Sequence, residues 1–355
     1  MSSLNDLIFT DIILDKGSNT NWLKGVPGHG EALVPLESLC PSLDIKLLEE
    51  ALATQMLAHK EMFVIRFKFE GIYFRASYAP SHDISPIEPL ARPEVAEEGN
   101  SPSPMCWFLR RLPEKVPSLS EIAPPAHITA YLTSEKAHGL ILIAGEQGAG
   151  KTTLASSIVK TRLMMYGGHC VTFESPAEMP LRGPHGTAGL CIQTEMDREE
   201  DLPQAVRRAH TFAQPDSIYI GEIKTAVAAA ETLRAALGSK NQLVIATIHG
   251  QDMVSAIQRL LIWGKEIDGD NAAVNLSTTL TAIFHLSLDT VKEKKQIVFN
   301  ETLLVPFGGD FCTKVRAKIK NHESDSLGNE VKSLKGILFG LGGDITPFID
   351  WGKTS

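Results

Sequence analysis

The sequence lacks most of the features that mark a specialised class of protein. It has five cysteines among 355 residues, and no two of them form a C-x-x-C pair. This scatter indicates neither a disulfide framework nor a zinc cluster. No apolar run approaches the roughly eighteen residues of a membrane span, and the first residues show no basic segment followed by an apolar core. We therefore expect a cytoplasmic protein.

An excess of positive charge is also missing. The chain has 34 Lys and Arg against 42 Asp and Glu, which gives a formal net charge of −8. Because a nucleic-acid backbone attracts a clustered excess of Lys and Arg, no nucleic-acid partner is expected. The remaining composition, 43% hydrophobic and 21% charged, is that of an ordinary globular protein long enough for two domains.

A proline-rich stretch divides the sequence into two parts. Residues 1–80 are predicted to form a small α+β N-terminal domain. Its expected elements are a strand, a helix and the two strands of a hairpin that turns at Glu70-Gly71, over residues 11–15, 47–57, 62–69 and 72–78. Residues 81–106 are rich in Pro, Ser and Glu and have little periodic apolar content, which indicates a linker or an inserted loop.

The second part, residues 107–355, alternates short apolar runs with helical patterns, which is typical of a parallel sheet covered by helices. The predicted strands are residues 140–144, 169–173, 217–220 and 243–247. The alanine-rich stretch 225–237 is a predicted helix that Gly238 ends. Residues 296–305 look like a further strand, and no pattern assigns a structure to the C-terminal extension beyond them.

One stretch has a spacing that dictates a chemistry. Residues 145–152 read Gly-Glu-Gln-Gly-Ala-Gly-Lys-Thr, between an apolar run and a helix-like segment. They match the G-x-x-x-x-G-K-[ST] pattern of a nucleotide phosphate-binding loop, whose glycines let successive N–H groups converge on phosphates at a helix N-terminus. The expected ATP-binding residues are Gly145, Glu146, Gln147, Gly148, Ala149, Gly150, Lys151, Thr152 and Thr153. Lys151 is expected to reach the β- and γ-phosphates, and Thr152 to hold Mg²⁺.

Polar residues follow the loop at predicted strand ends. Glu222 ends the strand at 217–220 and is the first candidate for the base that activates the attacking water. Glu174 and Glu178 follow another strand and could support Mg²⁺ or the water, although surface carboxylates would look the same. His249 follows the fourth strand, where it could sense the γ-phosphate and pass on its loss.

The order of these motifs resembles the secretion or traffic ATPases, which power type IV pili, type II secretion and conjugation machines. The motifs are the phosphate loop, Thr-Phe-Glu-x-Pro-x-Glu, Pro-Asp-x-x-x-x-Gly-Glu and Ala-Thr-Ile-His. The resemblance is strong over residues 108–260, weaker over the rest of 5–305, and most specific to the short pilus-retraction type. It implies an α/β fold, with a RecA-like P-loop ATPase domain preceded by a small α+β (PAS-like) N-terminal domain.

The resemblance also implies partners and residue roles. The family forms a ring of six, holds ATP and Mg²⁺ between domains, and works at the inner membrane by driving a platform protein through domain rotation. Glu222 would activate water, Glu178 would be an essential acid, and His249 would be the second histidine of the His box. Arg75 and Arg110 would reach the nucleotide from the N-terminal domain. Salt bridges within their own domain are the alternative for both arginines.

The sequence departs from the family pattern at several positions. Ser175 stands where Asp is usual, Gln242 where a first histidine is expected, and Phe212 where an Arg is common, although Arg208 lies nearby. The tetracysteine zinc element of longer relatives is absent, as is the C-terminal retraction motif. The leading hypothesis is an ATP-hydrolysing motor of a pilus or of a type II or type IVB secretion or conjugation apparatus. The alternative is an ATP-binding regulatory subunit that hydrolyses weakly and acts on an active paralogue.

Overall fold

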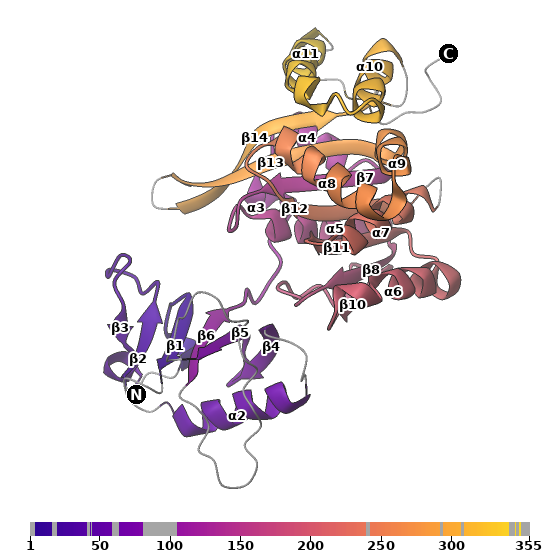
Figure 1. Cartoon of the computed structure of the whole chain (residues 1–355). Helices are drawn as coiled ribbons and strands as arrows, with labels where there is room; N and C mark the ends of the chain where they lie inside the picture. Colours follow the sequence, from indigo (N-terminus) through magenta and orange to yellow (C-terminus); the bar gives the residue numbers. More distant parts are fainter. Residues whose placement is uncertain are drawn as a thin grey trace. The chain divides into compact units, whose positions relative to one another are not determined.

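The computed structural model of the chain describes residues 4–15, 20–40, 43, 45–58, 64–80, 105–238, 242–291, 294–306, 309–340, 345 and 348. The chain divides into two compact units, Met1–Glu114 and Lys115–Ser355, and each contains one sheet (Figure 1). We call them the N-terminal unit and, after the ATPase domain that the sequence predicts there, the ATPase unit.

The N-terminal unit is built on a six-stranded sheet with the order β3-β2-β1-β6-β5-β4. Its strands are β1 Asp11–Asp15, β2 Thr20–Lys24, β3 Val34–Pro35, β4 Val64–Phe69, β5 Ile72–Pro80 and β6 Met105–Arg111. Its helices are η1 Leu4–Asp6, α1 Leu36–Leu39 and α2 Ile45–Ala58. Alternate strand residues are buried, as the two-residue period of a strand requires, and they share one apolar core with Leu48 and Leu52 of α2.

The elements predicted for the N-terminal part are present. The predicted strand is β1, the predicted helix is α2, and the predicted hairpin is β4–β5. Its turn residues Glu70 and Gly71 both have positive φ, +47° and +90°, as tight two-residue hairpins require. Residues 62 and 63, the expected start of the hairpin, lie outside the described residues.

Strand β6 corrects the predicted domain boundary, which fell within residues 81–106. It pairs antiparallel with both β1 and β5, and the two units divide after Glu114. Trp107 and Leu109 enter the core of the N-terminal unit, so residues 107–114 belong to that unit. Prolines show where local structure breaks, but they cannot show that the chain later returns to the same sheet. The predicted linker lies outside the described residues up to residue 104.

The ATPase unit is built on an eight-stranded sheet with the order β14-β13-β7-β12-β11-β8-β10-β9. Its strands are β7 Gly139–Gly145, β8 Gly168–Glu174, β9 Gly183–His185, β10 Gly189–Glu195, β11 Ser217–Ile223, β12 Leu243–His249, β13 Leu280–Val291 and β14 Lys294–Leu304. Neighbouring strands from β13 through β10 run parallel, whereas β14 and β9 pair antiparallel at the edges. The predicted strands correspond to β7, β8, β11, β12 and β14, so the α/β prediction is confirmed.

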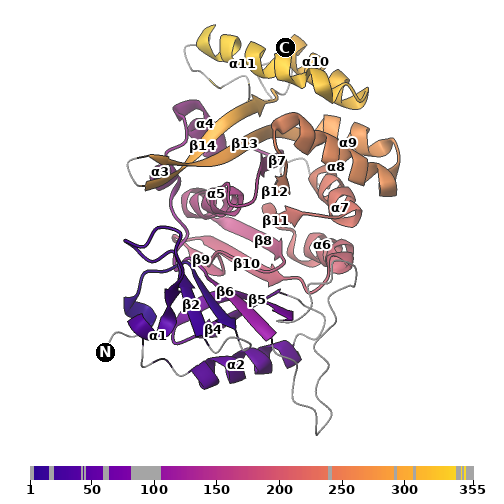
Figure 2. The same ribbon diagram turned by 60° about the vertical axis from the view of Figure 1, so that its left-hand side comes forward.

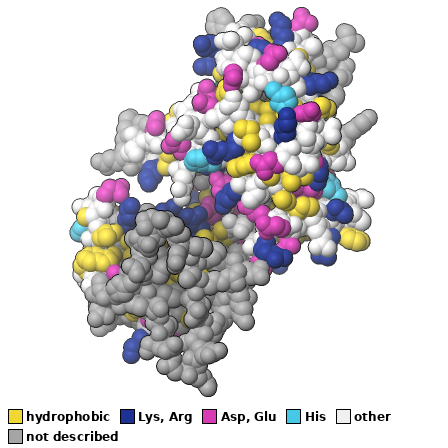
Figure 3. Space-filling view, in the orientation of Figure 1, with side chains coloured by type: hydrophobic (Ala, Val, Ile, Leu, Met, Phe, Trp, Pro, Cys, Tyr) yellow, Lys and Arg dark blue, Asp and Glu magenta, His cyan; other side chains and the backbone are white. Residues whose placement is uncertain are grey.

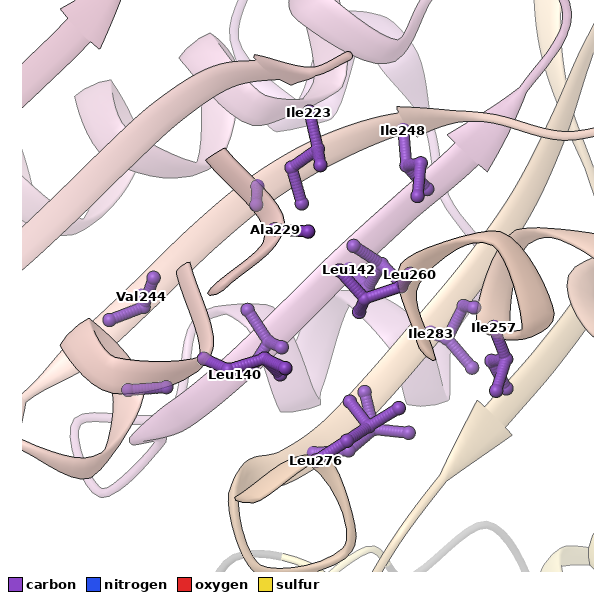
Figure 4. Close-up of a cluster of buried hydrophobic side chains, with 14 of the residues drawn as sticks. Leu140, Leu142, Ile223, Ala229, Val244, Ile248, Ile257, Leu260, Leu276 and Ile283 are labelled. Carbon is purple, nitrogen blue, oxygen red and sulfur yellow. The ribbon is translucent and has the colours of Figure 1, made fainter. Parts of the chain in front are cut away.

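Helices cover both faces of this sheet (Figure 2). One face carries α3 Leu119–Ile122, α4 Ala126–Leu132 and α5 Lys151–Tyr166. The other carries α6 Leu202–Arg208, α7 Ala226–Leu237, α8 Met253–Asp268 and α9 Asn271–Thr279, with η2 Glu199–Asp201 and η3 Ala209–Ala213 beside them. Figure 4 shows Leu142 of β7, Ile248 of β12 and Leu260 of α8 converging in this second core. Helix α7 begins and ends as predicted, with Thr225 as its N-cap and Gly238 as its C-cap.

The C-terminal extension contains two helices that no sequence pattern indicated, α10 Gly309–Lys320 and α11 Leu327–Gly340, with η4 Ser324–Ser326 between them. Val315 and Ile319 of α10 join the core beneath α8 and α9, while Leu334 of α11 joins the opposite one. Across the described parts of the chain, no helix has both the length and the apolar character to cross a membrane.

Candidate nucleotide-binding and hydrolysis site

The phosphate-loop motif folds as a strand, a tight loop and a helix, as its pattern predicts. Every residue of β7 is buried, and α5 begins at Lys151 directly after the loop. Gly145, Gly148 and Gly150 have φ of +154°, +80° and +89°, which L side chains rarely adopt. A Cβ on Gly145 would lie 2.6 Å from the Leu286 carbonyl oxygen. Strand β13 therefore holds the loop closely enough to exclude a side chain there.

Lys151 is folded onto this loop. Its side chain is 8% exposed, and Nζ donates to the carbonyl oxygens of Gly145 and Glu146, each at 3.0 Å. Oε1 of Glu222 lies 3.6 Å from the same nitrogen. Burial lowers the pKa of Lys151, and the charge of Glu222 opposes that shift. A phosphate that approached the loop would meet an ammonium group already held in place.

Glu222 lies at the carboxyl end of β11. The pairing of β11 with β12 shifts register between Ile220 and Ile223, and such irregularities re-aim side chains beside functional sites. Gly221 makes room for this, because a Cβ there would lie 3.1 Å from Cγ of Glu174. Oε2 of Glu222 is 3.2 Å from Nζ of Lys224. The carboxylate is therefore held between two lysine side chains at the edge of the phosphate loop.

Glu174 is a buried carboxyl group at the end of β8, 3% exposed. Its Oε1 accepts hydrogen bonds from Thr172 Oγ1 and Gln193 Nε2, both at 2.8 Å. Burial raises the pKa of Glu174 to about 7, the charges of Glu195 and Glu178 add to the rise, and the two hydrogen bonds oppose it. This group therefore titrates near neutral pH.

Glu178 and His249 also lie near the loop. Glu178 follows β8, is half-buried, and its charge acts on Lys151. His249 is the last residue of β12 and is paired in register with Gly145. Arg259 holds the carbonyl of His249 at 3.1 Å. The structure therefore places Glu222 beside Lys151, Glu178 where its charge acts on Lys151, and His249 on the strand that pairs with the start of the phosphate loop.

The oxygen groups at this site suit a magnesium ion that arrives with a nucleotide. Among the residues that the structure describes, no group of three or more His, Cys, Asp or Glu could hold a metal. Mg²⁺ usually keeps several waters and binds through one or two protein oxygens together with substrate phosphates. The Thr152 hydroxyl in the first turn of α5 and the nearby carboxylates Glu178 and Glu222 provide such a set, so the residues fit the predicted cofactor.

A small pocket lies beside Glu222. Its lining includes Glu174, Ser175, Met196 and Lys224. Ser175, a departure from the family pattern, therefore lies next to the candidate base. The other two departures do not. Gln242 precedes β12 at the end opposite His249 and donates to the Pro215 carbonyl at 2.7 Å, and Phe212 is 83% exposed on η3.

Arg75 and Arg110 belong to the N-terminal unit, where they face each other across β5 and β6. Arg66 lies opposite Arg75 on β4, so the three arginines occupy one row across the sheet. Nε of Arg110 is 2.9 Å from Oδ1 of Asp11, so the ion pair within its own domain, the alternative foreseen for Arg110, is present. We call Arg66, Arg75 and Arg110 the arginine row.

Sequence reasoning missed Tyr219 and Gln193. Tyr219 is fully buried in β11, and the charges of Glu174, Glu178 and Glu222 act on its hydroxyl. Gln193 of β10 holds Glu174. A polar ring in an otherwise apolar strand, Ser-Ile-Tyr-Ile-Gly-Glu, was the available signal for Tyr219. Nothing in the sequence paired Gln193 with Glu174, because parallel strands meet only in the folded sheet.

The chain is similar to known proteins in sequence and in fold. Among curated proteins, an uncharacterized protein, YggR, from Escherichia coli K12 is 28% identical over 198 residues, 55% of this chain and 58% of YggR. The type IV pilus ATPase PilU from Pseudomonas aeruginosa is 26% identical over 215 residues, 58% of this chain and 53% of PilU. The chain thus matches little more than half the length of these two relatives.

Two solved structures share the fold. The pilus retraction motor PilT with bound ADP superimposes with a TM-score of 0.67 at 21% identity, covering 95% of this chain and 90% of PilT. The ATPase DotB from Legionella pneumophila gives 0.63 at 20% identity, covering 93% of this chain and 83% of DotB. The predicted arrangement of an N-terminal domain before a RecA-like ATPase domain is confirmed. The family model described as type II/IV secretion system protein matches residues 118–325, and the chain belongs to this family.

Proposed function

We propose that the chain is an ATP-hydrolysing motor subunit of a type IV pilus or of a related type II or type IVB secretion or conjugation apparatus. The observation that carries the proposal is the pairing of Glu222 with Lys151 at 3.6 Å. A phosphate-binding lysine and a carboxylate beside it are the two groups that in-line attack of water on a γ-phosphate requires.

The residues divide this work between them. Backbone N–H groups of the loop, residues 145–150, and Lys151 bind the phosphates, and Thr152 is the protein ligand for magnesium. When bound, Mg²⁺ polarises the phosphoryl oxygens. Glu222 orients the attacking water and accepts its proton. That role requires the carboxylate to leave Lys151, which phosphate binding favours because the phosphate competes for the ammonium group.

Glu178 and His249 complete the site. Glu178 adds negative charge on the loop after β8, where it can order the water or the magnesium shell. His249 is tied through the β12 pairing to Gly145 and, through its carbonyl, to Arg259 of α8. It can therefore report loss of the γ-phosphate to that helix.

The arginine row supports a site completed between subunits. Like charges opposite each other on a sheet are unfavourable, and the strand register sets Arg66, Arg75 and Arg110 opposite one another, so this row attracts anions. We assign Arg75 and Arg110 to the nucleotide of a neighbouring subunit in a ring of six. Different affinities of two domain arrangements for ATP and ADP would then drive rotation against a platform protein at the inner membrane, with the motor on the cytoplasmic side.

The alternative is a regulatory subunit that binds ATP and hydrolyses it weakly. Ser175 favours it, because this departure alone among the three lies in the pocket beside Glu222. A nucleic-acid-driven ATPase has less support. In the view of Figure 3, Lys and Arg are interspersed with Asp and Glu over the ATPase unit, whereas a nucleic-acid groove concentrates positive charge.

Steady-state phosphate release by the full chain with Mg²⁺-ATP tests the proposal. Specific activity should rise with protein concentration if neighbouring subunits complete the site. Lys151→Ala should lose nucleotide binding, while the surface variant Glu266→Gln, on the exposed side of α8, should behave as wild type. ATP binding without turnover at any concentration would favour the regulatory subunit, and failure to bind ATP would reject both functions.

A further inference from the structure

Tyr219 has a hydroxyl that the core does not explain. Its ring is 0% exposed and packs in the apolar cluster between the sheet and α5. Its neighbours in the sheet are Thr172 of β8 and Ile245 of β12. The hydroxyl is buried and has no hydrogen-bond partner in the described parts of the chain. Since a buried unpaired hydroxyl is costly, phenylalanine would serve this core better.

The surroundings of the hydroxyl are those of the nucleotide site. The Thr152 side chain lies close to it, but outside hydrogen-bond geometry. Burial raises the pKa of Tyr219 well above its usual value, and the charges of Glu174, Glu178 and Glu222 add to the rise. The phenol therefore keeps its proton at any working pH, and the carboxylates attract that proton and leave the phenol oxygen free to accept.

The chemistry of Thr152 supplies the missing partner. When a threonine hydroxyl gives an oxygen lone pair to a cation, its own proton needs an acceptor. In the present arrangement no hydrogen bond from the Thr152 hydroxyl reaches Tyr219. A small rotation of Thr152 would direct its proton to the phenol oxygen, so one adjustment would satisfy both groups.

We propose that Tyr219 is a positioning residue that accepts a hydrogen bond from the Thr152 hydroxyl and thereby turns the threonine oxygen toward magnesium. The phenol proton points in turn toward the carboxylates at the ends of β8 and β11. This rests on the proposed function, because it takes Thr152 as the protein ligand for magnesium. No bond is made or broken, and Tyr219 does not touch the nucleotide.

The test is magnesium-dependent binding of a fluorescent ATP analogue to the full chain. Tyr219→Phe removes only the hydroxyl. The magnesium concentration for half-maximal binding should rise roughly 3- to 10-fold, the effect of one lost hydrogen bond, while affinity in EDTA stays unchanged. A role in core packing alone would leave the magnesium dependence unchanged.

Tyr131→Phe is the matched control. Tyr131 is also fully buried, belongs to the same apolar cluster, and has a hydroxyl without a hydrogen-bond partner in the described structure. Its magnesium dependence should equal that of wild type. An unchanged magnesium requirement in Tyr219→Phe, or an equal shift in both variants, overturns the inference.

Two further outcomes, an unfolded Tyr219→Phe variant and a wild type that binds no ATP analogue, can also be interpreted. If Tyr219→Phe does not fold, the wild type still decides, because adding magnesium to its ATP complex should shift the ultraviolet absorption of a buried tyrosine. That shift should persist in Tyr131→Phe and disappear in Thr152→Ala, and its absence from wild type overturns the inference. If wild type binds no ATP analogue at all, the proposed function fails; if it binds with magnesium and Tyr219→Phe matches it, only this inference fails.

Discussion

The two units bring polar and charged side chains together in different ways, because the sheet of one is mostly parallel and the sheet of the other is antiparallel. In the ATPase unit, parallel strands end on one edge, and this brings Glu174 of β8, Glu222 of β11 and His249 of β12 to one side of the phosphate loop. In the N-terminal unit, antiparallel strands align Arg66, Arg75 and Arg110 side by side in a row. The ends of neighbouring parallel strands bring side chains of different types to one edge of the sheet. The paired positions of the antiparallel strands instead place one type of side chain, arginine, on three neighbouring strands.

This difference suggests that the two units make unequal contributions to one reaction. In the proposed function, a lysine, a hydroxyl and carboxylates of the ATPase unit bind the nucleotide and activate water. Its described basic side chains at the site, Lys151 and Lys224, are both close to Glu222. Additional positive charge for the transition state is what the arginine row can supply.

Glu222→Gln should abolish turnover while leaving ATP binding intact. The amide keeps the size of the side chain but cannot accept the proton from water, so phosphate release should fall about 10²- to 10⁴-fold. ATP binding should stay equal or strengthen, because Lys151 loses a competing carboxylate. Rapid-quench phosphate release and equilibrium binding measure the two effects. Turnover above a tenth of wild type would move the base to another residue, and Glu178→Gln would then be measured.

Arg75→Ala should lower turnover about 100-fold, less than the roughly 10³- to 10⁵-fold that the best placed arginines contribute. Binding of ATP to dilute protein should not change, because the ATPase unit holds the phosphates by itself. Lys68→Ala is the matched control, since Lys68 is an exposed cation on the neighbouring strand β4. Equal activity of Arg75→Ala and Lys68→Ala would reduce the arginine row to charge pairing within its own unit.

Glycine replacements compare the backbone demands of the two units. Gly145→Ala places a Cβ 2.6 Å from the Leu286 carbonyl oxygen and should cost about 2–4 kcal/mol of unfolding free energy. Gly71→Ala in the β4–β5 turn meets no atom within 4 Å, so only its positive φ matters and about 1 kcal/mol is expected. Denaturant unfolding measures both. A larger loss for Gly71→Ala would mean that the phosphate loop relaxes around an added side chain.

Local signals explain how much of the site could be predicted from the sequence. The phosphate loop is one contiguous motif, and Glu222, Glu178 and His249 follow apolar runs whose ends a parallel sheet brings together. Each of these predictions needed only local sequence and one rule about strand ends. Their placement at the strand ends beside the phosphate loop agrees with that rule, while their chemical roles remain predictions.

Long-range pairing explains what could not be predicted. Strand β6 joins β1 across almost a hundred residues of chain, so composition placed the domain boundary too early. The hydrogen bond between Gln193 and Glu174 joins two parallel strands. Helices α10 and α11 contribute scattered residues such as Val315 and Leu334 to the cores of the ATPase unit, and these contacts form only in the folded chain.

The smallest expected effect concerns the titration of Glu174. Its pKa rises from 4.5 in the unfolded chain to about 7 in the folded one, so the folded protein binds this proton more tightly. The contribution to stability is therefore present below pH 4.5, declines as the pH rises to about 7, and is level above that. Glu174→Gln mimics the protonated form and keeps an oxygen to accept from Thr172 and Gln193. Between pH 5 and pH 8, its unfolding free energy should fall less than that of wild type, by about 1–3 kcal/mol.

Glu200→Gln provides the reference for this measurement, because Glu200 is an exposed carboxyl group on η2 and its removal changes the net charge equally. Urea unfolding of the three proteins at both pH values gives the comparison. Wild type and Glu200→Gln should lose stability together as the pH rises, and Glu174→Gln should not. A parallel decline in all three would show that the two hydrogen bonds to Oε1 outweigh burial and keep Glu174 ionised. In that case Tyr219 would face a permanent negative charge at the end of β8, and its proton would be held there more firmly.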